Sequence, residues 1–431
     1  MPLKWIVLII AVIMYVLVVI FPGKKSVSAL GAALLTVILG VVSPGEALGE
    51  LVNWNVLMIF VGSLVIAELF IYSRVPAVIA DSIVLHSPNV GIAIVAILMM
   101  TGIISAFVEN VATVLVMAPI ALALCKKLKL DPTYFMVGLA VMANLQGTAT
   151  LVGDPPSMIF ADFAQKLFGG FGFNEFFVFQ GKFSIFFAVQ IGMIAGAFFF
   201  YAYFAKKGGG KVQVEQETSL SMVPSILLIL MILGLAAASF VFGGISLVSG
   251  LLVVILAIAG LLWFRLIRRE SGSKVLEMIK GLDWDTVLFL IGIFVVVGAV
   301  AKVGLLNDFS VFLSHVVGNS VFLGFIIILI VSILISGFVD NVPYIIVMLP
   351  VAAQMAESLS LQPSLYMFAL LIGSCMGGNL TPFGASANIV TVGILKKQGV
   401  QLSFSQWLKI SVPFTLITVA ASAIFVWVVW R

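Results

Sequence analysis

The chain has 431 residues, of which 62% are hydrophobic and only 9% are charged, and its formal net charge is +4. A soluble domain carries about 25% charged residues, so a soluble globular fold is excluded, and the slight positive charge indicates no nucleic-acid partner because the basic residues lie between apolar runs. Only two cysteines are present, which excludes a disulfide framework and a thiolate metal cage.

The apolar runs are about 20 residues long, which predicts transmembrane helices rather than the short alternating strands of a membrane barrel. The first run lacks a small-residue cleavage site and leads directly into another span, so we interpret it as a transmembrane helix and not a signal peptide. A short amphipathic piece at 74–86 follows the third span. In chain order, the spans of the first half are 5–22, 28–43, 54–72, 90–124, 134–166 and 182–204.

Two of these spans are irregular. Residues 90–124 are split by Glu109 and Asn110, and the second arm, 111–124, is short for a full crossing at about 1.5 Å per residue. We therefore predict a re-entrant hairpin with this pair at its tip, buried at mid-membrane. Span 134–166 is broken at 147–156 by glycines and prolines, which predicts a transmembrane helix interrupted where it lines a cavity.

The second half repeats this plan after a hydrophilic linker at 206–221. Its spans are 223–242, 245–264, 284–303, the hairpin 321–357, the broken span 364–396, and 407–430. An offset of 231 residues relates Glu109 to Asp340 and Gly153 to Gly384. We therefore predict an all-α polytopic membrane protein of two inverted-topology repeats, 1–205 and 222–431, with about 10 crossings and 2 re-entrant hairpins.

The basic residues predict the orientation. An odd number of crossings in each half places 17 of the 22 lysines and arginines, Lys25 included, on one side of the membrane. The other five are Lys4, Lys166, Lys182, Lys302 and Arg431. The positive-inside rule assigns the first side to the cytoplasm, so we expect a multi-pass protein of the inner (plasma) membrane with a cytoplasmic linker and both termini outside.

Three acids are candidates for proton coupling. A carboxylate within a span costs roughly 2.5–3.5 kcal/mol on insertion scales, so Glu109 and Asp340 are functional candidates. Burial penalises the charged form of a carboxyl group, which allows proton exchange near neutral pH. Asp154 is the third candidate, although its counterpart in the second half is Ala385. The alternative for each acid is a helix cap.

Polar groups beside these acids predict a solute site. Asn110 and Asn341 follow the tip acids, and an amide both donates and accepts hydrogen bonds, which suits a neutral hydroxylated solute or a partly dehydrated cation. The alternatives are that the amides only satisfy hairpin backbone and that the breaks are mechanical kinks. The breaks contribute Thr148, Thr150, Gly153, Asn379, Thr381, Gly384, Ser386 and Asn388.

Four motifs carry a family resemblance. They are Glu-Asn-Val-Ala-Thr-Val-Leu-Val-Met-Ala-Pro from residue 109, Gly-Asp-Pro-Pro-Ser from 153, Asp-Asn-Val-Pro from 340, and Gly-Gly-Asn-Leu-Thr-Pro-Phe-Gly-Ala-Ser-Ala-Asn from 377. With them the chain resembles the ArsB/P-protein permeases of the ion transporter superfamily over nearly its whole length. The resemblance implies two hairpins and two broken helices in inverted repeats, and efflux of a metalloid or ion. The Gly-Asp-Pro-Pro stretch looks more like the P-protein side of the family.

We therefore expect a secondary transporter, not an enzyme, that exports arsenite or antimonite as neutral hydroxides in exchange for protons. A site of amides, hydroxyls and carbonyls matches the three hydroxyls of such a solute and needs no cysteine cage, metal centre or cofactor. A sodium/proton antiporter is the first alternative, and an anion or silicic-acid carrier is the second. The expected partners are the lipid bilayer, the solute, and protons or sodium. The resemblance leaves a partner ATPase subunit open, and the sequence does not determine the oligomeric state.

Overall fold

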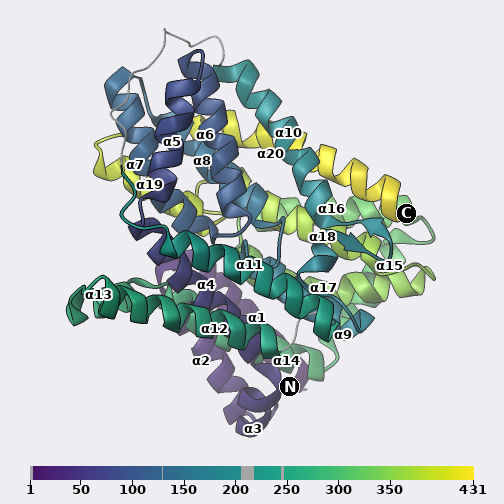
Figure 1. The fold of residues 1–431 in the computed structure, drawn as a ribbon. Helices are drawn as coiled ribbons and strands as arrows, with labels where there is room; N and C mark the ends of the chain where they lie inside the picture. Colours follow the sequence, from purple (N-terminus) through teal and green to yellow (C-terminus); the bar gives the residue numbers. More distant parts are fainter. Residues whose placement is uncertain (1–2, 129, 205–217, 244–246) are drawn as a thin grey trace.

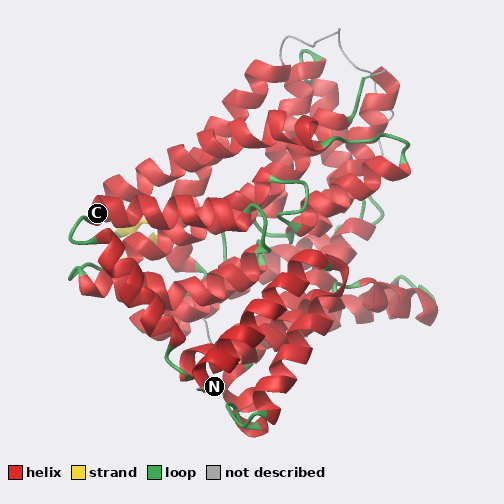
Figure 2. Ribbon diagram, turned by 180° about the vertical axis from the view of Figure 1, so that it is seen from behind, coloured by secondary structure: helices red, strands yellow, loops and turns green. Residues whose placement is uncertain are grey.

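The computed structural model describes residues 3–128, 130–204, 218–243 and 247–431, and the chain is almost entirely helical (Figures 1 and 2). Residues 206–217 of the predicted linker lie outside the described part. A two-stranded antiparallel hairpin, β1 (Val178–Phe179) and β2 (Lys182–Phe183), precedes α10. The first-half helices are α1 (Leu3–Ile20), α2 (Lys25–Ile38), α3 (Pro44–Glu46), α4 (Trp54–Tyr72), α5 (Val75–His86), α6 (Val90–Ser105), α7 (Asn110–Leu128), α8 (Thr133–Gly147), α9 (Pro155–Phe168) and α10 (Ile185–Phe204).

The second half repeats this order, so that α1 to α10 correspond to α11 to α20. Short 3-10 or π-helical turns lie at Pro22–Lys24, Ala47–Leu51, Asn174–Phe176, Trp263–Ile267 and Gly378–Leu380. The helices are α11 (Val223–Phe242), α12 (Leu247–Leu262), α13 (Gly272–Gly281), α14 (Trp284–Lys302), α15 (Leu305–Val317), α16 (Val321–Ser336), α17 (Asn341–Ser358), α18 (Ser364–Gly377), α19 (Ser386–Lys397) and α20 (Phe404–Trp430).

The predicted spans correspond to helices of the structure. Within the described ranges, eight helical segments are long and apolar enough to cross a membrane: α1, α4, α7, α10, α11, α12 with the turn after it, α14 and α20. The shorter α2 and the broken pairs α8/α9 and α18/α19 supply the remaining predicted crossings. One prediction was wrong: the second hairpin arm does not end at residue 124 and is not short, because α7 continues to Leu128 and has 19 residues.

Hydrogen bonds nevertheless hold each hairpin tip against the break of the span that follows it. The Thr150 hydroxyl in the first break donates to the carbonyl of Ala106, at the end of α6. Its counterpart Thr381 donates to the carbonyl of Gly337 at 2.5 Å. Since α6 packs along α8 and the two have 16 and 15 residues, each tip lies level with a break and not at the far face.

The first helices of each half pack against the other half. Helix α2 packs along α14, and α12 packs along α4, in the lower part of Figure 1. Small residues allow this close approach: a Cβ on Gly292 would lie 2.6 Å from the backbone of Ala29, and one on Gly62 would lie 2.8 Å from the side chain of Val253. Helices α6, α8, α10, α16, α18 and α20 form a second bundle, in which α10 packs along α20. The two hairpin tips lie where these bundles meet.

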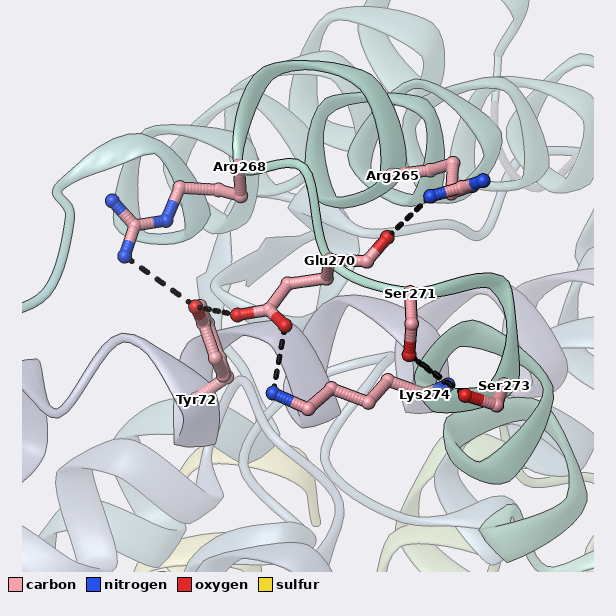
Figure 3. Close-up of polar contacts among 7 residues, drawn as sticks. All are labelled: Tyr72, Arg265, Arg268, Glu270, Ser271, Ser273 and Lys274. Atoms are coloured by element: carbon pink, nitrogen blue, oxygen red, sulfur yellow. Dashed lines mark hydrogen bonds and ion pairs between the residues drawn. The ribbon is translucent and has the colours of Figure 1, made fainter.

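A polar cluster joins α13 to the end of α4 (Figure 3). The carboxylate of Glu270 accepts hydrogen bonds from Lys274 Nζ at 2.7 Å and from the Tyr72 hydroxyl at 2.8 Å. Arg265 donates to the carbonyl of Glu270 at 2.7 Å. The hydrogen bonds from Lys274 and Tyr72 hold the pKa of Glu270 below its ordinary value, so this half-buried carboxylate is charged at neutral pH.

Candidate functional site

The hairpin tips and helix breaks enclose a small cavity of about 40 Å³. A buried water needs about 10–15 Å³ of such cavity volume, so the cavity has room for a few waters or a small ion. Both halves of the chain contribute to its wall. The lining residues are Lys25, Phe60, Glu109, Asn110, Asn144, Asp154, Pro155, Pro156, Asp283, Thr286, Asp340, Asn341, Val342, Ala385, Ser386 and Ala387.

Glu109 lies at the first tip and also caps the helix that follows it. Its Oε2 atom accepts hydrogen bonds from the backbone N–H groups of Val111 and Ala112, at 2.8 and 3.0 Å. The side chain is 9% exposed. Among the described residues, no lysine, arginine or histidine forms an ion pair with it, and the charged groups that face it are Asp283 and Asp154. Glu109 therefore both caps α7 and lines the small cavity.

Asp340 lies at the second tip in a different electrostatic setting. Its Oδ1 atom caps α17 by accepting from the N–H of Val342 at 3.1 Å. Its Oδ2 atom lies 3.3 Å from Nζ of Lys25, the first residue of α2. This lysine comes from the other half of the chain, and only 8% of its surface is exposed. Within the described residues, one tip acid is thus paired with a cation and the other is not.

Asp154 combines a helix cap with an unused oxygen. Its Oδ1 atom accepts from the backbone N–H of Ser157 at 3.0 Å, at the start of α9. Its Oδ2 atom is buried and has no hydrogen-bond partner among the described residues. The thiol of Cys375 lies beside it. A buried polar atom without a partner is costly, so this oxygen indicates a place for a proton or a cation.

Asn144 connects the two broken helices across the halves. Its Nδ2 group donates to Oδ1 of Asn379 at 2.9 Å and to Oδ1 of Asn388 at 2.8 Å. Asn388 in turn donates to the carbonyls of Gly378 and Thr381, both at 2.9 Å. The Asn144 Oδ1 atom is buried and has no partner in the described chain. The hydrogen-bonding capacity of the second-half amides therefore serves mainly to hold the breaks together.

The remaining break residues support the site rather than line the small cavity. Thr150 and Thr381 donate to the hairpins, as described above, and Thr148 donates to the carbonyl of Asn144 at 3.4 Å. Gly153 lies directly against the backbone of Gly147, where a Cβ has no room. A Cβ on Gly384 would lie 2.6 Å from the carbonyl oxygen of Gly378. Direct contact of these residues with a solute remains a prediction.

A second cavity, of about 350 Å³, adjoins the first. The two cavities share Lys25, Asp340, Ala385 and Ser386, and Gly384 lines the larger one. The Lys25–Asp340 pair therefore lies between a small polar cavity and a wider one that begins at the end of α1. Of the predicted site residues, Glu109, Asn110, Asp154, Asp340, Asn341 and Ser386 line the small cavity.

Sequence reasoning missed four polar residues of this wall: Lys25, Asn144, Asp283 and Thr286. Asp283 caps α14 by accepting from Thr286 N at 3.0 Å. Asn53 makes the same cap on α4, from Val56 N at 3.0 Å. The sequence could have pointed to Asp283. The matching helix starts are Asn53-Trp54-Asn55 and Asp283-Trp284-Asp285, so both asparagines of the first half are replaced by acids in the second half.

The charge balance limits what the small cavity can hold. Four carboxylates (Glu109, Asp154, Asp283 and Asp340) face one ammonium group, that of Lys25, so full ionisation gives a net charge of −3. Removing each unpaired ion from water costs several kcal/mol. Protons or a bound cation must therefore compensate the excess, and a multiply charged anion is disfavoured.

Comparisons with known proteins give one coherent result. The family model described as citrate transporter, CitMHS, matches residues 15–373 and again 325–431. The uncharacterized transporter Rv2684 of Mycobacterium tuberculosis is 30% identical over 96% of this chain and 95% of its own length. The P protein of Sus scrofa is 24% identical over 94% of this chain and 57% of its own length.

A solved structure shares the fold. The YdaH transporter of Alcanivorax borkumensis, described as having an unusual topology, aligns with a TM-score of 0.58 at 14% identity, covering 92% of this chain and 87% of that one. At this identity the likeness concerns the fold alone. The P-protein side of the predicted resemblance is found among these relatives, whereas the matches do not establish its arsenite branch.

Proposed function

The chain belongs to the CitMHS citrate transporter family of the ion transporter superfamily, and from this premise we propose that it exports a small hydroxylated solute in exchange for protons. It is a multi-pass membrane transporter, as its family and relatives are, and not an enzyme. The solutes that we propose are arsenite and antimonite as neutral hydroxides. The observation that carries the proposal is the cavity lined by four acids, one lysine and several amides.

The negative charge of the residues that line the cavity argues for an uncharged or cationic solute. A citrate anion entering alone would bring negative charge to a wall that already carries four carboxylates, and like charges at a site cost several kcal/mol. A neutral hydroxide brings no charge into the cavity and offers only hydrogen-bond donors and acceptors. Asn110, Asn341 and Ser386 line the cavity and can form hydrogen bonds with it.

Coupling requires that the charge of a site group change the affinity for the solute, because otherwise no coupling free energy exists. Glu109 meets this requirement best. It lies at a tip, it has no ion-pair partner among the described residues, and neutralising it changes both the desolvation cost and the hydrogen bonds offered to a solute. Asp154 is the second carrier, through its unpartnered Oδ2 atom.

One observation favours a second candidate function, sodium/proton exchange. The unpartnered, buried oxygens Asn144 Oδ1 and Asp154 Oδ2 both belong to cavity-lining residues. Amide and carboxylate oxygens are the ligands that hard cations prefer. Sodium and protons would then compete for the same group, and no metalloid would be carried.

Flux measurements in proteoliposomes test the proposal. Arsenite, antimonite, sodium and citrate are offered separately, without nucleotide, with and without an imposed pH gradient. We expect gradient-driven accumulation of the metalloid hydroxides and none of citrate. Sodium-dependent proton movement without metalloid flux would favour the antiporter, and citrate uptake would contradict the argument from cavity charge. Accumulation without nucleotide would also show that no ATPase subunit is required.

Three isosteric variants then locate the proton carrier. We expect Glu109→Gln to lose gradient-driven accumulation while it retains solute counterflow, because only a charge is removed. Asp154→Asn and Asp340→Asn are measured beside it, and Glu357→Gln, an exposed acid of α17, is the matched control. Loss in Asp154→Asn alone would move the carrier to the first break. Normal transport in all three would exclude coupling through these carboxylates.

A further inference from the structure

The two hairpin tips are equivalent in the fold but not in charge. Each tip acid caps the second arm of its hairpin, Glu109 at α7 and Asp340 at α17. Only Asp340 has an ion-pair partner in the described chain, Lys25. This difference bears on how many cations the transporter carries.

Lys25 is positioned by the second hairpin tip and by the start of α14. It lies at the start of α2, with Nζ 3.3 Å from Asp340 Oδ2 and 5.3 Å from the centre of the Phe289 ring. The other charged groups that face it are Asp283 and Asp285, at the start of α14. The hydroxyl of its neighbour Ser26 donates to Asp285, which fixes the start of α2 against α14.

The equivalent contact between the halves, that of α12 with α4, lacks these charges. There α12 packs along α4, and the N–H of Gly250 donates to Oδ1 of Asn55 at 3.0 Å, just as Ser26 contacts Asp285. The residues before Gly250 are Leu247, Val248 and Ser249, and α4 begins with Asn53 and Asn55 where α14 has Asp283 and Asp285. The lysine and its two flanking acids therefore occur together at only one of these two contacts between the halves, that of α2 with α14.

We propose that Lys25 is a fixed counter-cation for Asp340, which occupies the second tip acid and excludes it from cation exchange. The coupling cation is then carried by Glu109, and one fewer cation moves in each transport cycle than if both tips were available. This inference rests on the proposed function and adds the role of a residue to it. Because the pair lies between the small and the wide cavity, the ammonium group occupies the place that a cation would otherwise take.

Physical chemistry supports a fixed role. Removing one partner of a buried ion pair leaves an uncompensated charge, which is strongly unfavourable. Without Lys25, Asp340 in an acid-lined cavity would have to bind a proton or another cation. A neutral residue at position 25 therefore converts a fixed charge into an exchangeable site.

The test measures the ratio of coupling cations to solute in proteoliposomes from reversal potentials, with protons and sodium varied separately. We compare the wild type with Lys25→Met, which has a similar length and no charge, and with Lys25→Arg, which keeps the charge. We expect one additional cation per solute in Lys25→Met, a doubling if the wild type moves one, and an unchanged ratio in Lys25→Arg. The double variant Lys25→Met with Asp340→Asn should return to the wild-type ratio.

An unchanged ratio in Lys25→Met, or a raised ratio in the double variant, would overturn the inference while leaving the proposed function intact. If the wild type shows no cation-coupled flux, the proposed function fails instead. Thermal stability in detergent gives a readout independent of transport. Lys25→Met should be less stable than the double variant, because only the single variant retains an unpaired buried acid, and the reverse order would refute the counter-cation role.

Discussion

Replacement of Gly147 by alanine tests whether the first hairpin tip really lies against the first break. Gly147 ends α8, and a Cβ there would overlap the Asn110 side chain, with Nδ2 at 2.8 Å and Cγ at 2.9 Å. Asn110 cannot move away freely, because its Oδ1 atom accepts a hydrogen bond from Ser105 at 2.8 Å. Overpacking costs about 1–3 kcal/mol and loss of the hydrogen bond about 0.5–1.5 kcal/mol, so we expect a destabilisation of about 2–4 kcal/mol.

Gly393→Ala is the matched control. Gly393 lies within α19, and a Cβ there would have no atom within 4 Å, so alanine should stabilise the helix by about 0.5–1 kcal/mol. Thermal unfolding in detergent, followed by size-exclusion fluorescence, measures both variants, and proteoliposome flux measures transport. We expect Gly147→Ala to lose stability and flux together. If the two variants unfold at the same temperature and transport equally, the tip does not lie against the break and the site described above is misplaced.

Three further predictions follow from the proposed orientation, the Glu270 cluster and the cysteines. Ser219→Cys should react with an impermeant maleimide only from the cytoplasm and Gln180→Cys only from outside, and the opposite pattern would reverse the topology. The Glu270 carboxyl has a lowered pKa beside Lys274, so its stabilising contribution is present at neutral pH and disappears as the pH falls below about 4.3. The stability difference between wild type and Glu270→Gln should vanish in that range, and a difference that persists would refute the assignment. Serine in place of both cysteines should leave metalloid flux largely intact, and loss of flux at normal membrane levels would show thiol ligation.

The elements that carry the site could be predicted because they break strong local rules. Glu109 and Asp340 are acids within apolar runs, which membranes tolerate only for a reason. Gly153 and Pro155 interrupt a helix where free backbone groups must be satisfied. Such features are visible without any knowledge of which helices pack together.

The partners of these residues could not be predicted, because they depend on packing between distant helices. In the sequence Lys25 resembles an ordinary loop residue at the start of a span. Its partner Asp340 lies 315 residues further along the chain, so the pair is not visible without the fold. Asn379 and Asn388 look like free binding groups until their hydrogen bonds with Asn144 are seen. The length of α7 was underestimated for a local reason, since the helix continues past residue 124 through Lys126 and Lys127, where the apolar run ends.

The packing of helices of one half against helices of the other half has a consequence for biogenesis. Ser26 meets Asp285 across 259 residues, so α2 must wait in the membrane until α14 has been synthesised before it can dock. During that interval the charge of Lys25 has none of its later acidic neighbours, Asp283, Asp285 and Asp340. The first half is therefore an incomplete folding unit on its own, although its helices can insert. Two polypeptides, 1–205 and 222–431, should assemble into one transporter when they are produced in the same cell, and each alone should be degraded.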